Sequence, residues 1–389
     1  MIYCQEMHIY SSFVHIFADK AMKRPYMLNM KSVTKPKIAI AGARGYSGLE
    51  LTRILLQHPN VEVSGLFASA PFDPVDSWPE LNGSSLQGQS INALLENPGN
   101  YDCAFLALPH EASAELAPKL LAAGLNVIDL SGAFRLQEGT PQECAKAYEK
   151  LYKMPKHPGM EWLSKAQYSL VPFYNPQARP EPQLISNPGC YATALTMALI
   201  PLVKAKLIDP SFIAIDAKSG TTGAGKKAEE RLLYSEVADN CLPYRIGNHQ
   251  HEPEIQMALR RWGGAPIDMS FTPHLLPSRR GIIASIYGKT PANTTDEMIH
   301  KAFEEAFGSY PLVRFGSLKN AGQERELKLT RVIGSPRTHI SWKLDGTRIT
   351  IFSLIDNLLK GAASQAVENM NGIFGWPVSL GLTNKEGLL

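Results

Sequence analysis

The chain has 389 residues, of which 44% are hydrophobic and 19% charged, and its mean hydropathy of −0.14 is typical of a globular protein. No apolar run approaches the roughly 18 to 20 residues that a membrane-spanning helix needs, so the sequence gives no reason to expect a membrane partner. The net charge of +3 comes from residues 1–37, which hold six Lys/Arg and two Asp/Glu, and the near-neutral remainder gives no electrostatic reason to expect nucleic acid. Five cysteines without regular spacing argue against a disulfide framework and favour a reducing, cytoplasmic location.

Residues 1–35 read as a leader without sustained periodicity, and they contain five of the twelve methionines. A secretory signal places basic residues before an apolar segment, whereas here the basic cluster follows residues 1–17. A targeting segment stays an alternative. We expect a disordered tail or an upstream start, with Met27 or Met30 beginning the functional chain.

A predicted strand, Lys37–Gly42, runs into GARGYSGLELTRILLQHP, where glycines 42, 45 and 48 open a predicted helix. Free N–H groups and the helix dipole make such a turn an anion site. The spacing differs from the usual dinucleotide fingerprint, so a tight turn without a ligand stays an alternative. The next strand, Val61–Phe67, is followed by Ser69 and no acidic residue, where NAD-preferring sites place Asp or Glu. Ser69 and Arg44 therefore favour NADPH, with a merely solvated Arg44 as the alternative.

The strand–helix alternation continues with a strand at Tyr101–Pro109, a helix that ends at Gly124, and a strand within LNVIDLSGAFR. Ligands bind outside the carboxyl ends of the strands in such sheets. We therefore expect Pro109, Ser131 and Gly132 to lie beside a cofactor.

Cys190 stands where the strand-like run Gln183–Ser186 and the turn Asn187-Pro-Gly lead into a predicted helix. A helix N-terminus stabilises a thiolate, so this position gives a thiol both exposure and activation. We interpret Cys190 as a nucleophile, and a small apolar helix residue is the alternative.

The segment RIGNHQHEPEIQMAL supplies a proton carrier for that thiol. Glu254 is three residues after His251 and within local reach to orient its imidazole, which matches nucleophile–base–orienter logic. His249 and His251 also have a metal spacing, but no third and fourth ligands cluster nearby, so we expect no metal.

Three later segments add loop, charge and helix-capping features. The strand Phe212–Asp216 precedes KSGTTGAGKKAEE, whose glycines let the backbone approach a ligand. FTPHLLPSRRGIIASIYG places Arg279 and Arg280 before the strand Ile282–Tyr287, where an Arg would clamp a carboxylate or phosphate, unless the pair is simply solvated. TRITIFSLIDNLLKGAASQAVENM is a predicted strand followed by an amphipathic helix, with helix capping as the plain role of Asp356 and Asn357.

Taken together, these segments resemble the N-acetyl-γ-glutamyl-phosphate reductase family of arginine biosynthesis, and more distantly the aspartate-semialdehyde and glyceraldehyde-3-phosphate dehydrogenases. The resemblance runs from about Pro36 to the C-terminus, and several motifs in one order are more specific than any single one. The motifs that carry it are GARGYSG at 42–48, DLSGAFR at 129–135, NPGCY at 187–191, SGTTGAG at 219–225, HQHEPEI at 249–255, FTPH at 271–274 with Arg280-Gly281, and DNLLKG at 356–361.

The resemblance implies that Cys190 forms a thioester and that His251 is the acid/base, preferred over His249 because Glu254 orients it. It implies an NADP(H) site made by Gly42, Arg44, Gly45, Tyr46, Ser47, Gly48, Ser69, Pro109, Ser131, Gly132, Ser219, Gly220, Gly223 and Asn357. It implies a substrate site made by Asn187, Arg135, Lys218, His274 and Arg280, with the phosphate held in the Lys218/Arg280 region.

The resulting expectation is an α/β protein with a Rossmann-type, doubly wound parallel domain (36–186 and 357–389) and an α+β catalytic domain (187–356) whose sheet is mostly antiparallel. The C-terminal helix returns to the Rossmann domain, and a homo-oligomer, dimer or tetramer, is expected. The expected reaction reduces N-acetyl-γ-glutamyl phosphate to the semialdehyde and releases inorganic phosphate. A reductase of aspartyl phosphate or of carrier-bound aminoadipyl phosphate, a Cys-His hydrolase or acyltransferase, and a nucleotide-sensing regulator are the alternatives.

Overall fold

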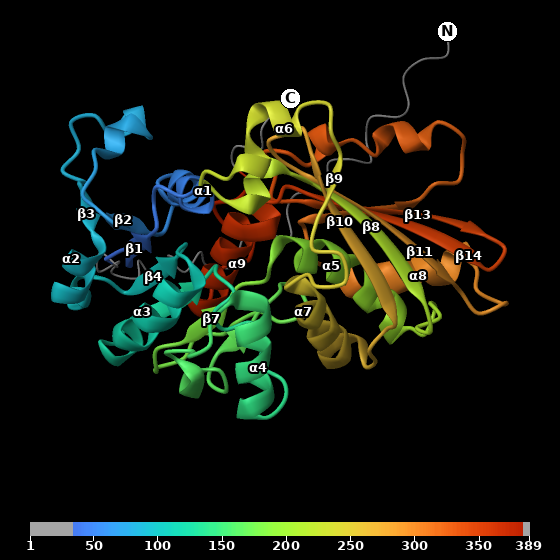
Figure 1. The fold of residues 1–389 in the computed structure, drawn as a ribbon, viewed down its shortest axis with the longest axis horizontal. Coiled ribbons are helices and arrows are strands. Elements are labelled where there is room, and N and C mark those ends of the chain that lie inside the picture. Colours follow the sequence, from blue (N-terminus) through green and yellow to red (C-terminus); the bar gives the residue numbers. More distant parts are fainter. Residues whose placement is uncertain (1–33, 384–389) are drawn as a thin grey trace, which may run out of the picture. The chain divides into compact units, whose positions relative to one another are not determined.

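The computed structural model describes residues 34–383, so the prediction of a disordered leader at 1–35 falls almost wholly outside the described residues. Two sheets of seven strands each organise residues 36–383 (Figure 1). The helices are α1 Tyr46–Leu55, α2 Ile91–Glu96, α3 His110–Ala122, α4 Pro141–Tyr152, α5 Cys190–Lys204, α6 Tyr234–Val237, α7 His251–Ala258, α8 Asp296–Phe307 and α9 Ser364–Ile373. None of the helices within 34–383 is long and apolar enough to cross a membrane.

The first sheet has the strand order β3-β2-β1-β4-β5-β7-β6, and every neighbouring pair is parallel. Its strands are β1 Lys37–Ala41, β2 Glu62–Ala68, β3 Gly88–Ser90, β4 Cys103–Leu106, β5 Asn126–Asp129, β6 Gln167–Tyr168 and β7 Leu184–Ser186. Alternate residues of β1 enter different cores: Ile38 and Ile40 pack in the cluster that contains α1 and α9, and Ala39 and Ala41 in the cluster that contains α3. Burial on both faces explains why this strand is continuously apolar.

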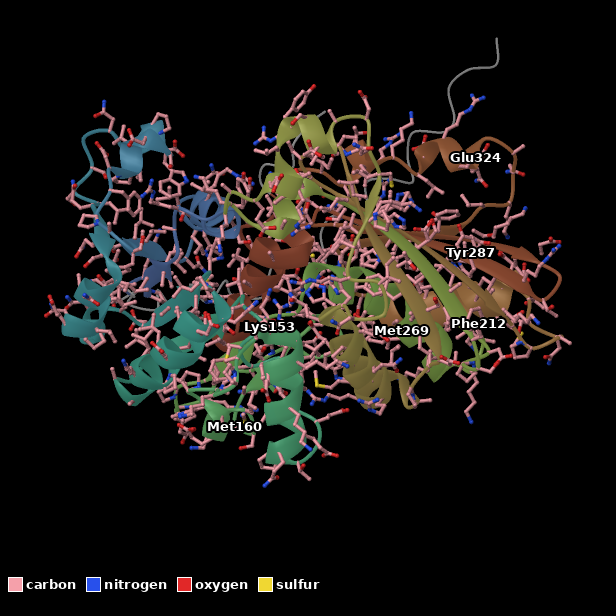
Figure 2. The ribbon with its side chains drawn as sticks, in the orientation of Figure 1. Lys153, Met160, Phe212, Met269, Tyr287 and Glu324 are labelled. Carbon is pink, nitrogen blue, oxygen red and sulfur yellow. The ribbon has the colours of Figure 1, made fainter. Side chains whose placement is uncertain are left out.

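The second sheet has the order β12-β13-β14-β11-β8-β10-β9 and is mixed, with parallel β8/β10 and β12/β13 pairs among mostly antiparallel ones. Its strands are β8 Ile213–Gly220, β9 Leu242–Pro243, β10 Met269–Leu276, β11 Ile282–Lys289, β12 Val313–Ser317, β13 Thr338–Asp345 and β14 Arg348–Ile355. Helices α5 and α8 cover one face (Figure 1). Tyr287 of β11 is 45% exposed on the opposite face (Figure 2).

The C-terminal helix returns to the first sheet, as predicted. After β14 the chain makes a π-helical turn, Leu359–Ala363, and continues as α9, whose ten residues are all buried. Helix α9 contacts α1 and β5, so the predicted fold class is confirmed. The division of the chain at 186/187 and 356/357 stays a prediction.

Candidate active site

Cys190 is the first residue of α5, at the junction with the carboxyl end of β7. The turn that precedes Cys190 is fixed by three hydrogen bonds of Asn187. Its carbonyl oxygen accepts from Arg135 Nε at 2.9 Å, its Nδ2 donates to the Ala362 carbonyl at 3.2 Å, and its Oδ1 accepts from Asn369 Nδ2 at 3.0 Å. The position of the thiol is therefore set by the first sheet and by the C-terminal segment together.

Burial has the largest effect on the pKa of the Cys190 thiol. It raises the pKa of Cys190 to about 11, although Arg135 and the backbone N–H of Tyr191 oppose the shift. The sequence predicted an exposed, activated thiolate, and both expectations are wrong here, because Cys190 is half-buried and desolvation outweighs the helix N-terminus. At neutral pH the sulfur carries its proton and needs a base to accept it.

His251 lies against the turn that carries the thiol. A Cβ atom at Gly189 would be 2.2 Å from His251 Nε2, and Arg135 Nη1 is 3.4 Å from the same nitrogen. Burial, followed by the charge of neighbouring side chains, holds the pKa of His251 well below its usual range, so the ring is neutral at neutral pH. A neutral imidazole against the turn that carries Cys190 has a ring nitrogen that is able to accept a proton.

His249 lies behind His251, with ring centroids 4.8 Å apart. Its Nδ1 accepts the backbone N–H of His251 at 3.1 Å, and its ring packs edge-on against Tyr191 and Phe271. Burial, followed by the charge of Arg245, lowers the pKa of His249 to about 3. Among the described residues, no group of three His, Cys, Asp or Glu side chains is arranged to hold a metal ion.

Glu254 does not orient the imidazole, contrary to the prediction. Its Oε1 accepts from the backbone N–H of Gly189 at 2.7 Å and from the Tyr168 hydroxyl at 2.8 Å, and its Oε2 lies 3.6 Å from Arg135 Nη1. The described residues provide no hydrogen-bond partner for His251 Nδ1. Glu254 lies about one turn of α7 after His251 and points at the turn before Cys190. Its carboxylate therefore fixes Gly189 and neutralises the charge of Arg135.

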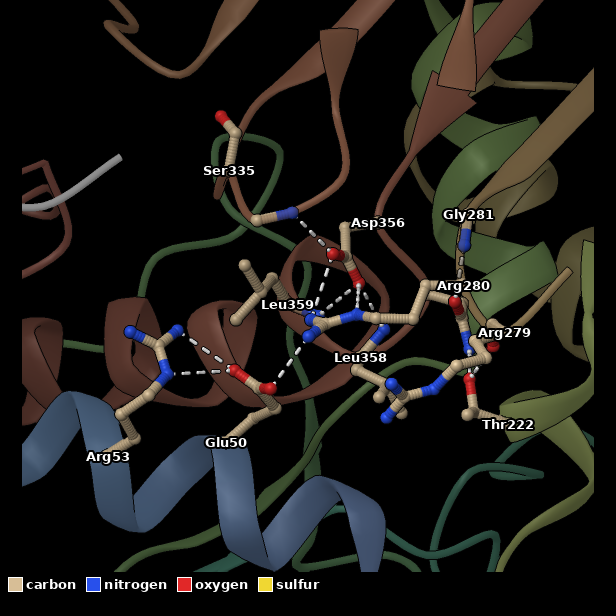
Figure 3. Close-up of polar contacts among 12 residues, drawn as sticks. Glu50, Arg53, Thr222, Arg279, Arg280, Gly281, Ser335, Asp356, Leu358 and Leu359 are labelled. Carbon is tan, nitrogen blue, oxygen red and sulfur yellow. Dashed lines mark hydrogen bonds and ion pairs between the residues drawn. The ribbon is translucent and has the colours of Figure 1, made fainter. Parts of the chain in front are cut away.

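Arg280 does not offer a free cation for phosphate (Figure 3). Its guanidinium group lies 2.7 Å from Glu50 Oε1 and 2.8 Å from Asp356 Oδ2. Both carboxylates come from elements far from Arg280 in sequence, which is why the sequence could not reveal them.

Lys218, predicted for the phosphate region, and His274, predicted for the substrate site, both lie on the second sheet. Strand alternation and register place them side by side on the face of the second sheet opposite the buried Ser219. Both contact Asp216, Lys218 through a short ion pair and His274 through Nδ1 at 3.2 Å. Lys218 and Arg280, the two residues predicted to hold the phosphate, are therefore both paired with carboxylates, and Arg135 is the cation near Cys190.

The glycine turn after β1 is a close backbone crossing. Gly42 has φ +89°, and a Cβ there would lie 2.2 Å from the Ala107 carbonyl oxygen. Helix α1 begins at Tyr46 with no side-chain cap and no acidic residue in its first turn, so its N–H groups are left to an anion, which fits a dinucleotide pyrophosphate. Of the other residues predicted for this site, Gly45 is the N-cap of α1, and Ser47 and Gly48 lie in its first turn. Arg44 and Ser69 are exposed at the ends of β1 and β2.

Two further predicted groups gather at strand ends. Ser131 donates to Asp129 at 2.9 Å, and the N–H of Gly132 donates to His110 Nδ1 at 2.8 Å, next to Pro109 at the start of α3. In the second sheet, a Cβ at Gly223 would lie 3.1 Å from Ser219 Oγ and 3.9 Å from Asn357 Nδ2. Gly220 follows Ser219 at the end of β8. The loop after β8 and Asn357 at the end of β14 therefore lie next to each other.

Comparisons with known proteins show to which family the chain belongs. Family models described as the semialdehyde dehydrogenase NAD binding domain and the semialdehyde dehydrogenase dimerisation domain match residues 37–179 and 190–357. The N-acetyl-γ-glutamyl-phosphate reductases of Bacillus subtilis (strain 168) and Geobacillus kaustophilus (strain HTA426) are each 40% identical to the chain; the matches cover 89% of it and 98% and 97% of theirs. The chain belongs to the N-acetyl-γ-glutamyl-phosphate reductase family.

Solved structures of proteins with more distant sequences have a similar fold. Aspartate semialdehyde dehydrogenase II of Vibrio cholerae matches with a TM-score of 0.65 and 18% identity, over 88% of this chain and 99% of that one. The Candida albicans aspartate semialdehyde dehydrogenase with NADP matches with a TM-score of 0.58 and 16% identity, over the same shares. At such identities the likeness concerns the fold.

The sequence also missed contacts around the thiol of this reductase family member. Gly361 lies so close to Cys190 that a Cβ there would be 2.8 Å from the Cys190 Cβ. A glycine inside an otherwise helical pattern is a known sign of close packing, so this signal was present in the sequence. Tyr168, the partner of Glu254, gave no such sign, because it lies on the two-residue edge strand β6.

Proposed function

We propose that this chain reduces N-acetyl-γ-glutamyl phosphate to N-acetylglutamate 5-semialdehyde and releases inorganic phosphate. The observation that carries the proposal is the constellation of Cys190, His251 and Arg135 around the turn at Gly189, in a chain of this family. The turn and its supporting contacts supply a nucleophile, a neutral base and a cation at one point.

The proposed first step is formation of a thioester. The sulfur of Cys190 bonds to the acyl carbon, the carbon–oxygen bond to phosphate breaks, and His251 Nε2 takes the thiol proton and passes it to the leaving phosphate. Arg135 beside His251 stabilises the negative charge of the acyl phosphate. Glu254 acts indirectly, because it holds the N–H of Gly189 and the guanidinium of Arg135 in place.

The dinucleotide, when bound, supplies hydride to the thioester carbon. The alkoxide oxygen then re-forms the carbonyl double bond as the carbon–sulfur bond breaks and returns its electron pair to Cys190. The Cys190 sulfur takes a proton that His251 relays from solvent, so the thiol is restored. The residues proposed to hold the nicotinamide end are Ser219, Gly220, Gly223 and Asn357. Those proposed for the phosphate end are the turn at 42–48, Ser69, Pro109, Ser131 and Gly132.

We propose NADPH rather than NADH as the cofactor. No acidic residue follows β2 where a ribose hydroxyl would need one, and the exposed Arg44 and Ser69 offer a guanidinium and a hydroxyl to a 2′-phosphate. Arg44 also lies 5.8 Å from the ring centre of Phe72, which places its charge at this edge of the sheet.

We propose that the protein is a homo-oligomer, a dimer or tetramer, in the cytoplasm. The match to a dimerisation domain supports self-association through the second part of the chain. The exposed Tyr287 on the open face of the second sheet also supports self-association (Figure 2). The four described cysteines are free, which supports a reducing compartment such as the cytoplasm. Light scattering of the purified protein measures the number of subunits.

The activity is tested in the reverse direction, with N-acetylglutamate semialdehyde, phosphate and NADP⁺. We expect NADPH to form only when phosphate is present, and Cys190→Ser to abolish this while NADPH binding is retained. Aspartate semialdehyde serves as the competing substrate. Equal or faster turnover of aspartate semialdehyde, or full activity of Cys190→Ser, contradicts the proposal.

A further inference from the structure

Four charged side chains of alternating sign form a row between α1 and the end of β14 (Figure 3). Arg53 donates to Glu50 Oε2 at 2.9 and 3.1 Å, and Arg280 Nη1 lies 2.7 Å from Glu50 Oε1. Arg280 Nη2 then lies 2.8 Å from Asp356 Oδ2. The Arg280 and Glu50 side chains are 19% and 17% exposed and Asp356 is fully buried, so the inner part of the row is shielded from water.

Asp356 fixes the beginning of the π-helical turn that lies against Cys190. Its Oδ1 accepts the backbone N–H groups of Leu358 and Leu359 at 2.8 and 3.2 Å, and its Oδ2 accepts that of Gly334 at 2.8 Å. Its carbonyl oxygen accepts the N–H of Gly361 at 3.0 Å. The position of Asp356 therefore sets the position of the turn that lies against Cys190.

The backbone beside Arg280 fixes the two elements proposed for the nicotinamide end. The N–H of Gly281 donates to Asn357 Oδ1 at 2.8 Å, and Asn357 Nδ2 donates to Thr222 Oγ1 at 3.0 Å. Thr222 Oγ1 donates in turn to the Arg279 carbonyl at 2.6 Å. The backbone of one short turn, 279–281, thus holds Asn357 and the loop at 219–225. The side chain of Arg280 in the same turn reaches Glu50 of α1.

We propose that Arg280 is a positioning residue that fixes helix α1, at the phosphate end of the dinucleotide site, relative to Asn357 and the 219–225 loop, at the nicotinamide end. The inference rests on the proposed function and deepens it, because it assigns Arg280 a role in cofactor alignment. The planar guanidinium group of Arg280 donates from Nη1 and Nη2 in two fixed directions, so one side chain joins both carboxylates in a defined geometry.

The remaining contacts indicate that Arg280 links these elements and is not needed to fold them. Without its guanidinium, Asp356 keeps three backbone N–H donors and Glu50 keeps Arg53. Removal of Arg280 therefore leaves both carboxylates with donors while it cuts the only described ion-pair connection between them.

The experiment compares Arg280→Met and Arg280→Lys with the parent protein and with Arg53→Met. Arg53→Met removes the same charge and a Glu50 contact but leaves the link to Asp356 intact. The first readout is hydrogen exchange with and without saturating NADPH. In the parent and in Arg53→Met, we expect NADPH to slow exchange both in α1 and in 357–363. In Arg280→Met, protection is confined to α1. Equal protection of both segments in Arg280→Met overturns the proposal.

The second readout separates the two chemical steps. We expect Arg280→Met to release phosphate from the acyl phosphate in a burst at a rate within about threefold of the parent, while NADPH oxidation in a single turnover slows about 100-fold, as a misplacement of about 1 Å does. For Arg280→Lys, we expect a rate of NADPH oxidation between those of the parent and of Arg280→Met. An equal loss in both steps, or a loss in neither, contradicts the positioning role. A parent protein without reductase activity refutes the proposed function, whereas the exchange measurement still decides the inference.

Discussion

Substitution of Gly361 by alanine tests whether the C-terminal segment sets the position of the thiol. The added Cβ would lie 2.8 Å from the Cβ and 3.2 Å from the Cα of Cys190. Carbon atoms pack best at about 3.5 to 4.0 Å, so the two segments must separate by about 1 Å. Neither contacted atom belongs to a flexible side-chain end, because both are fixed to the first residue of α5. A displacement of about 1 Å at a reacting group costs about 100-fold in rate.

The free energy of unfolding is expected to change less in Gly361→Ala than the activation free energy, which a 100-fold loss of rate raises by about 2.7 kcal/mol. Alanine favours a helix over glycine by about 1 kcal/mol, whereas overpacking costs about 1 to 3 kcal/mol, so the net loss is about 0 to 2 kcal/mol. The assay is the rate of Cys190 acylation, followed as burst release of phosphate, together with the free energy of unfolding in urea. Gly316→Ala is the control, because a Cβ at Gly316 meets no atom within 4 Å. An acylation rate in Gly361→Ala within threefold of the parent refutes the reasoning.

Three further predictions concern charge and protonation. Alkylation of Cys190 by iodoacetamide, measured by peptide mass spectrometry, rises about tenfold per pH unit from pH 7 to 9, because its pKa is about 11; a plateau below pH 8 contradicts this. The unfolded chain protonates His249 near pH 6.5, whereas the folded protein keeps it neutral until about pH 3, so stability falls as the pH is lowered through this window. From pH 7 to 5 this residue contributes a loss of about 2 kcal/mol, which urea titrations of His249→Phe should lack. Glu254→Gln leaves the buried Arg135 without its counter-ion and should cost about 3 kcal/mol in the free energy of unfolding, whereas the same change at the more exposed Glu138 costs less than about 1 kcal/mol; equal costs refute the assigned role.

Local sequence determined the parallel sheet and the place of Cys190, the proposed nucleophile. The strand at 37–41 is apolar on both faces, and the glycines after it allow a turn that few other residues adopt, so both features follow from neighbouring residues. Cys190 follows a strand and a turn and begins a helix, and each part of that pattern is local. Short edge strands such as β6 and β9 have two residues each, too few to show a period, and the sequence did not identify them.

Tertiary structure decided which partner each charged side chain has. Glu254 is close to His251 in sequence but bonds to Gly189 and Tyr168, and Arg280 bonds to Glu50, 230 residues away. Such pairings depend on how the two sheets and α9 are brought together, which no local pattern encodes.

The sequence by itself determined the family, the order of the elements and the residue that carries the thiol, because these follow from motifs and from short-range periodicity. Only the tertiary structure decided the protonation state of that thiol and the roles of the charges around it. Burial raises the pKa of Cys190 against the effect of its helix N-terminus, and desolvation of this kind depends on everything packed around the sulfur, not on its neighbours in the chain.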